Sequence, residues 1–190
     1  MSAISQVPAA FPEIDRQTRE SGFTMPSEIL TCSLLRTLAA SKPAGRFLEL
    51  GTGTGLSTAW LLDGMDAAST LVSVDNAAEF LDIAIRNLGT DSRADFVCRD
   101  GGEWLEENQH SRFDFIFADT WHGKYLLLDE ALALLNPGGM YFIDDMLPQA
   151  NWPEGHDLKV ANLRAVLAAR SDLDVTELDW ASGLIIAVKK

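Results

Sequence analysis

The chain of 190 residues carries 28 acidic and 15 basic residues, which gives a formal net charge of −13 at pH 7. Nucleic-acid binding needs clustered Lys and Arg, and because no basic run is present we expect no nucleic-acid partner. No apolar run is long enough to cross a membrane and the N-terminus lacks the plan of a signal peptide, so we expect a cytoplasmic protein without a membrane partner.

The chain is predicted to consist of an N-terminal arm, residues 1–24, and one domain over residues 25–190. Apolar residues recur at helical spacing in 26–42, which predicts a helix there with Ser27 as a candidate cap. Short apolar runs then alternate with helical stretches, a pattern that predicts a parallel sheet with helices on both faces. The predicted strands are 46–50, 70–74, 95–98, 113–118 and 140–144, and the helices between them are 56–64, 77–88, 102–107 and 123–135.

The C-terminal part of the chain departs from this alternation. A helix predicted over 157–169 is followed by two apolar runs, 173–180 and 184–190. The link between the two runs is too short for a crossover helix, so they are expected to pair as an antiparallel hairpin. The predicted fold class is therefore α/β, with a doubly wound, seven-stranded, mostly parallel sheet and an antiparallel C-terminal strand.

Three glycines follow the first predicted strand, at positions 51, 53 and 55 of the stretch RFLELGTGTGLSTAW (46–60). The dinucleotide-binding pattern G-x-G-x-x-G requires its third glycine at position 56, where this chain has Leu56. The loop therefore disfavours a nicotinamide or flavin dinucleotide and indicates a different ligand.

Four of the predicted strands lead into an aspartate, and these are Asp75, Asp100, Asp119 and Asp144. Ligands of open parallel sheets bind beyond the carboxyl ends of the strands, so these side chains predict an acidic ligand-binding rim. The alternative for each single Asp is that it only caps the following helix. At the end of the second strand, the carboxylate of Asp75 can accept both hydroxyls of a ribose.

Glu49 lies within the first predicted strand, where a buried carboxylate is costly unless it has a partner. One candidate partner is a cationic ammonium group of the ligand. The other is a basic side chain in a structural salt bridge, and the residues alone leave both open.

The motif ELGTGTG (49–55), an acid followed by Gly-x-Gly-x-Gly, resembles the first motif of the class I S-adenosylmethionine-dependent methyltransferases. The resemblance covers residues 25–190, including the order of elements and the terminal hairpin. It implies a Rossmann-like sheet and S-adenosylmethionine as cofactor. The residues that it assigns to cofactor binding are Glu49, Gly51, Gly53, Ser57, Asp75, Asp100 and Gly101.

The same resemblance implies a role for each of these side chains. The glycines let the backbone approach the methionine part and the ribose of the cofactor. Ser57 would hold the cofactor's carboxylate and Asp75 its ribose hydroxyls. Asp100 would lie with Gly101 beside the adenine.

Two further motifs, FADTWHGKY (117–125) and FIDDM (142–146), resemble the metal-dependent small-molecule O-methyltransferases, which include the catechol and caffeoyl-coenzyme A enzymes. The resemblance implies that Asp119, Asp144 and Asp145 hold a divalent ion, usually Mg²⁺. The family has Asn in the position of Asp145 and a catalytic Lys in the position of His122. The alternative is that Asp145 caps a turn and Asp144 orders a substrate loop.

His122 is the candidate general base, because its unperturbed pKa of about 6.5 suits proton transfer near neutral pH. A surface position without a role is the alternative. Trp121 and Trp152 are candidates for the wall of the acceptor pocket, or they simply pack. Lys124, with its neighbour Tyr125, is expected to start the following helix and to be structural.

The sequence thus predicts transfer of a methyl group from S-adenosylmethionine to an oxygen of a small-molecule acceptor, with Asp119 and His122 as catalytic residues. The alternatives are a metal-independent N-, C- or carboxyl-methyltransferase and a non-catalytic cofactor-binding module, since fold alone does not give function. The identity of the acceptor and the formation of a homodimer are left open.

Overall fold

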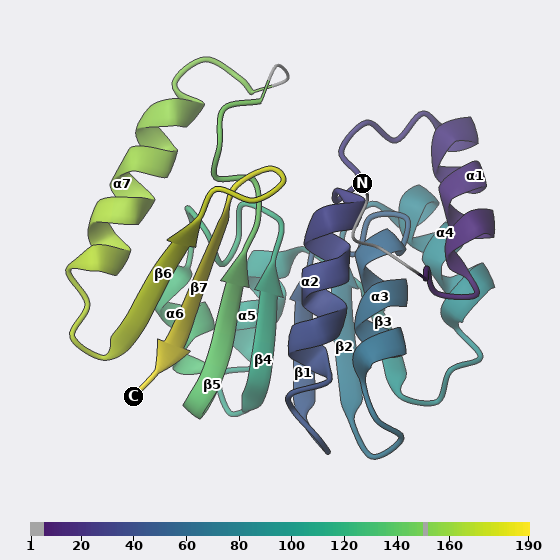
Figure 1. The fold of residues 1–190 in the computed structure, drawn as a ribbon, viewed down its shortest axis with the longest axis horizontal. Coiled ribbons are helices and arrows are strands. Elements are labelled where there is room, and N and C mark those ends of the chain that lie inside the picture. Colours follow the sequence, from purple (N-terminus) through teal and green to yellow (C-terminus); the bar gives the residue numbers. More distant parts are fainter. Residues whose placement is uncertain (1–5, 150–151) are drawn as a thin grey trace.

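The computed structural model describes residues 6–149 and 152–190 and shows one sheet with helices on both of its faces (Figure 1). The helices are α1 (Phe11–Ser21), α2 (Ile29–Ala39), α3 (Leu56–Gly64), α4 (Ala78–Leu88), α5 (Gly101–Glu107), α6 (Leu128–Ala133) and α7 (His156–Ala168). The strands are β1 (Arg46–Leu50), β2 (Thr70–Asp75), β3 (Ala94–Cys98), β4 (Phe113–Ala118), β5 (Leu135–Ile143), β6 (Leu173–Leu178) and β7 (Leu184–Lys189). Over the described ranges, no helix is long and apolar enough to cross a membrane.

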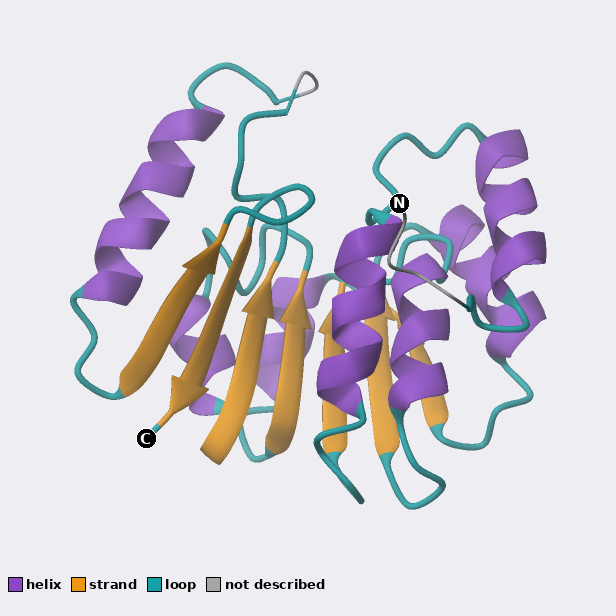
Figure 2. Ribbon diagram, in the orientation of Figure 1, coloured by secondary structure: helices purple, strands orange, loops and turns teal. Residues whose placement is uncertain are grey.

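The seven strands form a single sheet in the order β3-β2-β1-β4-β5-β7-β6. The pairs from β3 to β5 are parallel, whereas β7 runs antiparallel to both β5 and β6. Figure 2 shows the arrow of β7 pointing against those of its two neighbours. The predicted fold class, including the antiparallel C-terminal hairpin, is therefore confirmed.

The order of the strands creates a crevice beyond the end of β1. From β1 the chain moves through α3 to β2 on one side, and after β3 it returns across the sheet to β4 on the other side. The loops that follow β1 and β4 therefore diverge, and this is the point at which open α/β sheets bind ligands.

Alternating side chains of the central strands pack into two hydrophobic clusters, one on each face of the sheet. Leu48 points into a cluster with residues of α5, α6 and α7, while Phe47 points into a cluster with residues of α1, α2 and α3. In Figure 1, α2 and α3 accordingly lie in front of the strands and α5 lies behind them. Glu49 of β1 is fully buried among these side chains, and so are polar residues close to it such as Thr58 and Ser73.

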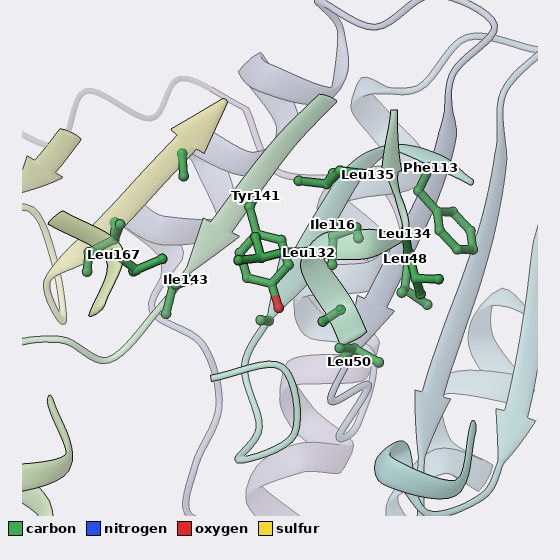
Figure 3. Packing of buried hydrophobic residues seen from close by; sticks show 14 of the residues in the cluster. Leu48, Leu50, Phe113, Ile116, Leu132, Leu134, Leu135, Tyr141, Ile143 and Leu167 are labelled. Carbon is green, nitrogen blue, oxygen red and sulfur yellow. The ribbon is translucent and has the colours of Figure 1, made fainter. Parts of the chain in front are cut away.

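Tyr141 of β5 connects the core to the loop that follows β4. Its ring lies in the first cluster together with Ile116 and Leu132, which Figure 3 also labels. Its hydroxyl donates a hydrogen bond of 2.6 Å to the main-chain oxygen of Gly123. The loop over residues 119–127 is thereby fixed against the sheet.

Within the N-terminal arm, residues 6–24 contain helix α1, and its Phe11 and Ile14 are buried in the second cluster. Strand β5 begins at Leu135, before its predicted start at 140, and helix α2 spans Ile29–Ala39, shorter than the predicted 26–42. The helix predicted over 123–135 begins only at Leu128, because residues 123–127 form a turn with a left-handed Leu127 (φ 55°) just before it. That turn places the residues after β4 in the crevice.

Candidate active site

A cavity of about 470 Å³ occupies the crevice beyond the ends of β1, β2, β4 and β5. It is closed on one side by residues 23–28, which connect α1 to α2. Of the residues predicted for the site, it is lined by Gly51, Gly53, Ser57, Asp75, Asp119, Trp121, Asp144, Asp145 and Trp152. Glu49, Asp100, Gly101 and His122 do not line it.

The glycine loop brings its backbone to the cavity at two positions where a side chain would not fit. Gly51 has a φ of 103°, and a Cβ on it would lie 2.8 Å from the main-chain oxygen of Asp119. Gly53 has a φ of 53°, and a Cβ on it would lie 3.0 Å from the ring of Phe23. Glycine is therefore required for the loop to lie between the β4 loop and the segment that covers the cavity.

Asp75 stands at the end of β2 with its carboxylate held by the backbone. It accepts hydrogen bonds from the N–H of Gly53 at 2.7 Å and from the N–H of Ala77 at 2.8 Å. A carboxylate has about four lone-pair sites, so acceptor capacity remains for two ligand hydroxyls. This placement fits the ribose-binding role predicted for Asp75.

Glu49 is held by three hydroxyl groups of the protein. Ser57, Thr58 and Ser73 each donate a hydrogen bond of 2.6 Å to its carboxylate. Burial nevertheless raises the pKa of Glu49 to about 7. Its hydrogen-bond partners within the protein are these three hydroxyls and, among the described residues, no basic side chain, so Glu49 fixes the start of α3 through Ser57 and Thr58.

Asp100 acts as the cap of α5. Its carboxylate accepts hydrogen bonds from the N–H of Gly102 at 2.9 Å and of Glu103 at 3.2 Å. The ring of His122 lies against the same helix start, with Nε2 4.0 Å from Oδ1 of Asp100. The structure therefore does not bring His122, the predicted base, into the cavity with Asp119.

Lys124 takes the place in the cavity that the sequence assigned to His122. Its ammonium is buried, donates a hydrogen bond of 2.8 Å to the main-chain oxygen of Asp144, and lies 4.0 Å from Oδ1 of Asp119. The reason is the turn at Gly123 (φ 84°), where a Cβ would lie 2.7 Å from the hydroxyl of Tyr141. This turn directs residue 122 away from the cavity and residue 124 into it.

The carboxylates beside Lys124 are poorly solvated. Burial raises the pKa of Asp119 to about 6, and burial together with the charge of Asp119 raises the pKa of Asp144 to about 7. Asp119 accepts a hydrogen bond of 2.9 Å from the hydroxyl of Ser27, and Asp144 accepts one from Ser182. Both acids are thus poised to exchange protons near neutral pH.

The chain bends directly after β5, so that both members of the aspartate pair line the same cavity. Asp145 has a φ of 64°, which is unusual for a residue with a side chain. Its carboxylate accepts hydrogen bonds of 3.1 and 3.2 Å from the indole N–H of Trp152.

Aromatic rings form the wall of the cavity next to Asp145. The rings of Trp152 and His156 lie 4.6 Å apart, and the Tyr125 hydroxyl lies 3.1 Å from Nε2 of His156. Trp121 packs edge-on against Tyr125 with 6.2 Å between ring centroids. Trp121 and Trp152 thus line the cavity, and Tyr125 and His156 join them there.

A model of the methyltransferase domain family matches residues 48–146, from β1 through the aspartates that follow β5. The chain belongs to this family. The predicted membership of the methyltransferases is thereby confirmed, and the matched range holds the glycine loop, Asp75, Asp119 and Lys124.

Individual relatives agree with this assignment. The O-methyltransferase hkm8 of Aspergillus hancockii is 29% identical over 153 residues, which are 73% of this chain and 60% of that protein. The crystal structure of the O-methyltransferase from Bacillus cereus in complex with SAH has a TM-score of 0.85 and 20% identity, covering 99% of this chain and 94% of that chain. The O-methyltransferase TomG from Streptomyces achromogenes in complex with SAM has a TM-score of 0.83 and 22% identity, covering 100% and 93%.

The three aspartates of this methyltransferase do not fit a divalent ion as they are arranged. Within residues 6–149 and 152–190, no group of three or more His, Cys, Asp or Glu side chains is placed to hold one. Asp119 faces the ammonium of Lys124, and Asp145 is bound by Trp152. The structure therefore places the ammonium of Lys124, rather than a set of metal ligands, beside Asp119 and the backbone of Asp144.

Three residues of the site were not assigned to it from the sequence. Lys124 was expected to start a helix and to be structural, and His156 belongs to no motif. Ser27 was expected to cap α2, yet its hydroxyl donates to Asp119 across 92 positions of the chain. Only the tertiary fold brings these side chains together.

Proposed function

We propose that the chain is an S-adenosylmethionine-dependent O-methyltransferase that acts on a hydroxyl group of a small-molecule acceptor. The observation that carries the proposal is the position of Lys124 between Asp119 and the backbone of Asp144, in the same cavity as the glycine loop. A hydroxyl group loses its proton when its oxygen is methylated. Lys124 provides a cation beside that oxygen, and Asp119 and Asp144 provide carboxylates that can accept the proton.

The cofactor half of the cavity is formed by the glycine loop and Asp75. The backbone at Gly51 and Gly53 would follow the methionine part and the ribose, and the free lone pairs of Asp75 would accept the ribose hydroxyls. Phe23 and Phe80, with ring centroids 4.8 Å apart, line the same region and shield it from water. When bound, S-adenosylmethionine supplies a methyl group on a positively charged sulfur.

The acceptor half is formed by Lys124, the two acids and the aromatic wall. The ammonium of Lys124 would hold the acceptor oxygen and favour the negative charge that develops on it. Asp119 and Asp144 are the groups suited to take its proton, because burial raises the pKa of both carboxyl groups toward neutral pH. The rings of Trp121 and Trp152 would flank a planar acceptor and keep it in line for attack.

The negative charge of the cavity lining favours a neutral or cationic acceptor over a strongly anionic one. The cavity is lined by Glu28, Asp75, Asp119, Asp144 and Asp145, against the single ammonium of Lys124. A thioester of coenzyme A carries several phosphate charges and would be repelled by this lining. We therefore favour uncharged phenols and catechols as acceptors.

The proposal is tested by incubating the purified chain with S-adenosylmethionine and a panel of phenols, catechols and carboxylic acids. Formation of S-adenosylhomocysteine together with an O-methylated product is the expected result. Calorimetric binding of S-adenosylhomocysteine is measured in parallel on the wild type and on Asp75→Ala, which should bind it at least tenfold more weakly. Cofactor binding without turnover of any acceptor would favour a non-catalytic binding module instead.

A further inference from the structure

A tyrosine and a histidine form a hydrogen-bonded pair in the wall of the cavity. Tyr125 directly follows Lys124 in the chain, and His156 is the first residue of α7. The hydroxyl of Tyr125 lies 3.1 Å from Nε2 of His156, and both residues line the cavity. The pair therefore holds a hydroxyl group next to the place where Lys124 would bind the acceptor.

The surroundings of His156 favour one form of its ring. The side chain is only 5% exposed, and its Nδ1 is buried without a hydrogen-bond partner in residues 6–149 and 152–190. Burial lowers the pKa of His156 and so favours the neutral ring, which carries its single proton on one of the two nitrogens. Among main-chain groups, a buried N–H without an acceptor is rarer than a carbonyl without a donor. The same preference places the imidazole proton on Nε2, where the oxygen of Tyr125 accepts it.

The hydroxyl of Tyr125 then keeps its own proton for another partner. A phenolic hydroxyl can accept and donate at the same time, and no other described residue is hydrogen-bonded to this one. Burial and the charges of Asp145 and Asp119 raise the pKa of Tyr125 to about 12, so the hydroxyl stays protonated near neutral pH. Tyr125 is therefore a hydrogen-bond donor in the cavity, while the buried acids are the candidates for the base.

Two donors thus lie side by side in the acceptor half of the cavity. The ammonium of Lys124 is 5.7 Å from the ring centroid of Tyr125. Edge-on contacts with Trp121 and His156, at centroid distances of 6.2 and 5.2 Å, keep the Tyr125 ring in place. A small acceptor can therefore meet Lys124 with one oxygen and Tyr125 with a second oxygen on the neighbouring carbon.

We propose that the hydroxyl of Tyr125 donates a hydrogen bond to a second oxygen of the acceptor, and that His156 is the positioning residue that directs this hydroxyl. Lys124 holds the oxygen that receives the methyl group, and Tyr125 determines specificity through the oxygen beside it. This assignment rests on the proposed function. It specifies the substrate class as phenols that carry a hydroxyl or ether oxygen ortho to the reacting hydroxyl.

Three acceptors test the role of Tyr125. Phenol, catechol and 2-methoxyphenol are assayed with saturating S-adenosylmethionine on the wild type and on Tyr125→Phe, which removes only the hydroxyl. Phenol has no second oxygen and is the internal reference. The loss of kcat/KM in Tyr125→Phe should be about three- to tenfold larger for the other two acceptors than for phenol, the usual effect of one hydrogen bond between uncharged groups. The additional loss should lie mainly in KM, because the bond to the second oxygen is present both before and during methyl transfer.

The comparison of catechol with 2-methoxyphenol tests the direction of the hydrogen bond. The ether oxygen of 2-methoxyphenol can accept a hydrogen bond but cannot donate one. An additional loss for catechol alone would mean that Tyr125 accepts from the acceptor, which would overturn the proposal. Equal losses for all three acceptors would show that Tyr125 only packs in the wall, and would overturn it as well.

Substitutions of His156 test its positioning role. His156→Phe keeps a ring in the wall but removes Nε2, so the ratio of kcat/KM for catechol to that for phenol should fall toward the value of Tyr125→Phe. His156→Gln offers an amide N–H to Tyr125 and should restore most of the ratio. His122→Phe is the matched control, and its ratio should equal that of the wild type because His122 lies outside the cavity. An unchanged ratio in His156→Phe would overturn the positioning role.

The position of the imidazole proton can be measured without relying on a variant that folds. In the wild type labelled with ¹⁵N-histidine, NMR correlation of the ring nitrogens with the ring protons should show His156 with its proton on Nε2. A proton on Nδ1 would make Tyr125 the donor to His156. The hydroxyl would then have no proton for the acceptor, and the proposal would be overturned.

Failure of this inference can be distinguished from failure of the proposed function. Turnover of phenol and binding of S-adenosylhomocysteine report on the proposed function alone. If no acceptor is methylated, the affinities of phenol and catechol for the S-adenosylhomocysteine complex are measured by calorimetry on the wild type and on Tyr125→Phe. The preference for catechol should be about three- to tenfold smaller in the variant. The same preference in both proteins would overturn the role of Tyr125.

Discussion

The ammonium of Lys124 lies 2.8 Å from the main-chain oxygen of Asp144 and 4.0 Å from the carboxylate of Asp119. The loops after β4 and β5 are thereby joined through one cation. An ammonium has three donors, and the hydrogen bond to Asp144 uses one of them, so the Lys124 ammonium can donate to a further oxygen in the cavity.

Replacement of Lys124 should therefore affect the chemical step more than cofactor binding. Lys124→Met removes the charge at nearly constant length, and we expect kcat to fall by about 10²–10³-fold, the usual effect of losing one group that stabilises developing charge. Calorimetric affinity for S-adenosylhomocysteine should stay within threefold. His122→Ala is the comparison, and it should retain most of the activity because His122 lies outside the cavity. The opposite ranking of the two variants would restore His122 as the base.

The contrast between positions 122 and 124 shows where sequence reasoning reaches its limit. The strands, their order and the terminal hairpin follow from hydrophobic patterning, link lengths and the resemblance of the glycine loop. The direction of each side chain within residues 119–127 depends on one left-handed glycine and on a hydrogen bond from Tyr141, which lies 18 positions away. No local pattern encodes that contact. The spacing in the sequence therefore pointed to His122, whereas the structure places Lys124 beside Asp119.

The same limit applies to Glu49. Its place in a buried strand indicated a partner, but the three hydroxyls that bind it come from α3 and β2. Ser57 and Thr58 directly follow the glycine loop, so their proximity to Glu49 could be predicted from the sequence. The proximity of Ser73 could not, because it depends on the parallel register of β1 and β2.

Glu49 should make the stability of the protein depend on pH. Burial raises its pKa in the folded state to about 7, above its ordinary value of 4.5, so the folded state binds the proton more tightly. Its stabilising contribution is therefore complete below about pH 4.5 and is lost as the pH rises through 7. Glu49→Gln cannot ionise, so its free energy of unfolding, measured with urea from pH 5 to 8, should fall less steeply than that of the wild type. Parallel pH profiles would show that the ionisation of Glu49 is not linked to folding.

Ser27 should tune the ionisation of Asp119. The hydrogen bond from its hydroxyl lowers the pKa of Asp119 against the effect of burial. In Ser27→Ala this bond is lost, so the pKa should rise and the acid limb of the kcat/KM profile should move to higher pH. Ser33→Ala, on α2 but outside the cavity lining, is the control and should leave the profile in place. An unmoved acid limb in Ser27→Ala would mean that Asp119 is not the group that titrates in that limb.

Divalent ions should not be needed for activity. Asp119, Asp144 and Asp145 already bind Ser27, Ser182 and Trp152, and Lys124 provides the positive charge between the first two. We therefore expect equal rates of methyl transfer with excess EDTA and with added Mg²⁺, and no saturable heat when Mg²⁺ is titrated into the S-adenosylhomocysteine complex.

Asp144→Ala sharpens the metal experiment, because it removes a carboxylate that a Mg²⁺ site would require. Its titration should be indistinguishable from that of the wild type. Saturable Mg²⁺ binding to the wild type that disappears in Asp144→Ala would contradict the lysine-centred site. It would mean that the three carboxylates rearrange around an ion, with Asp145 released from Trp152, and loss of activity in EDTA would then follow the loss of binding.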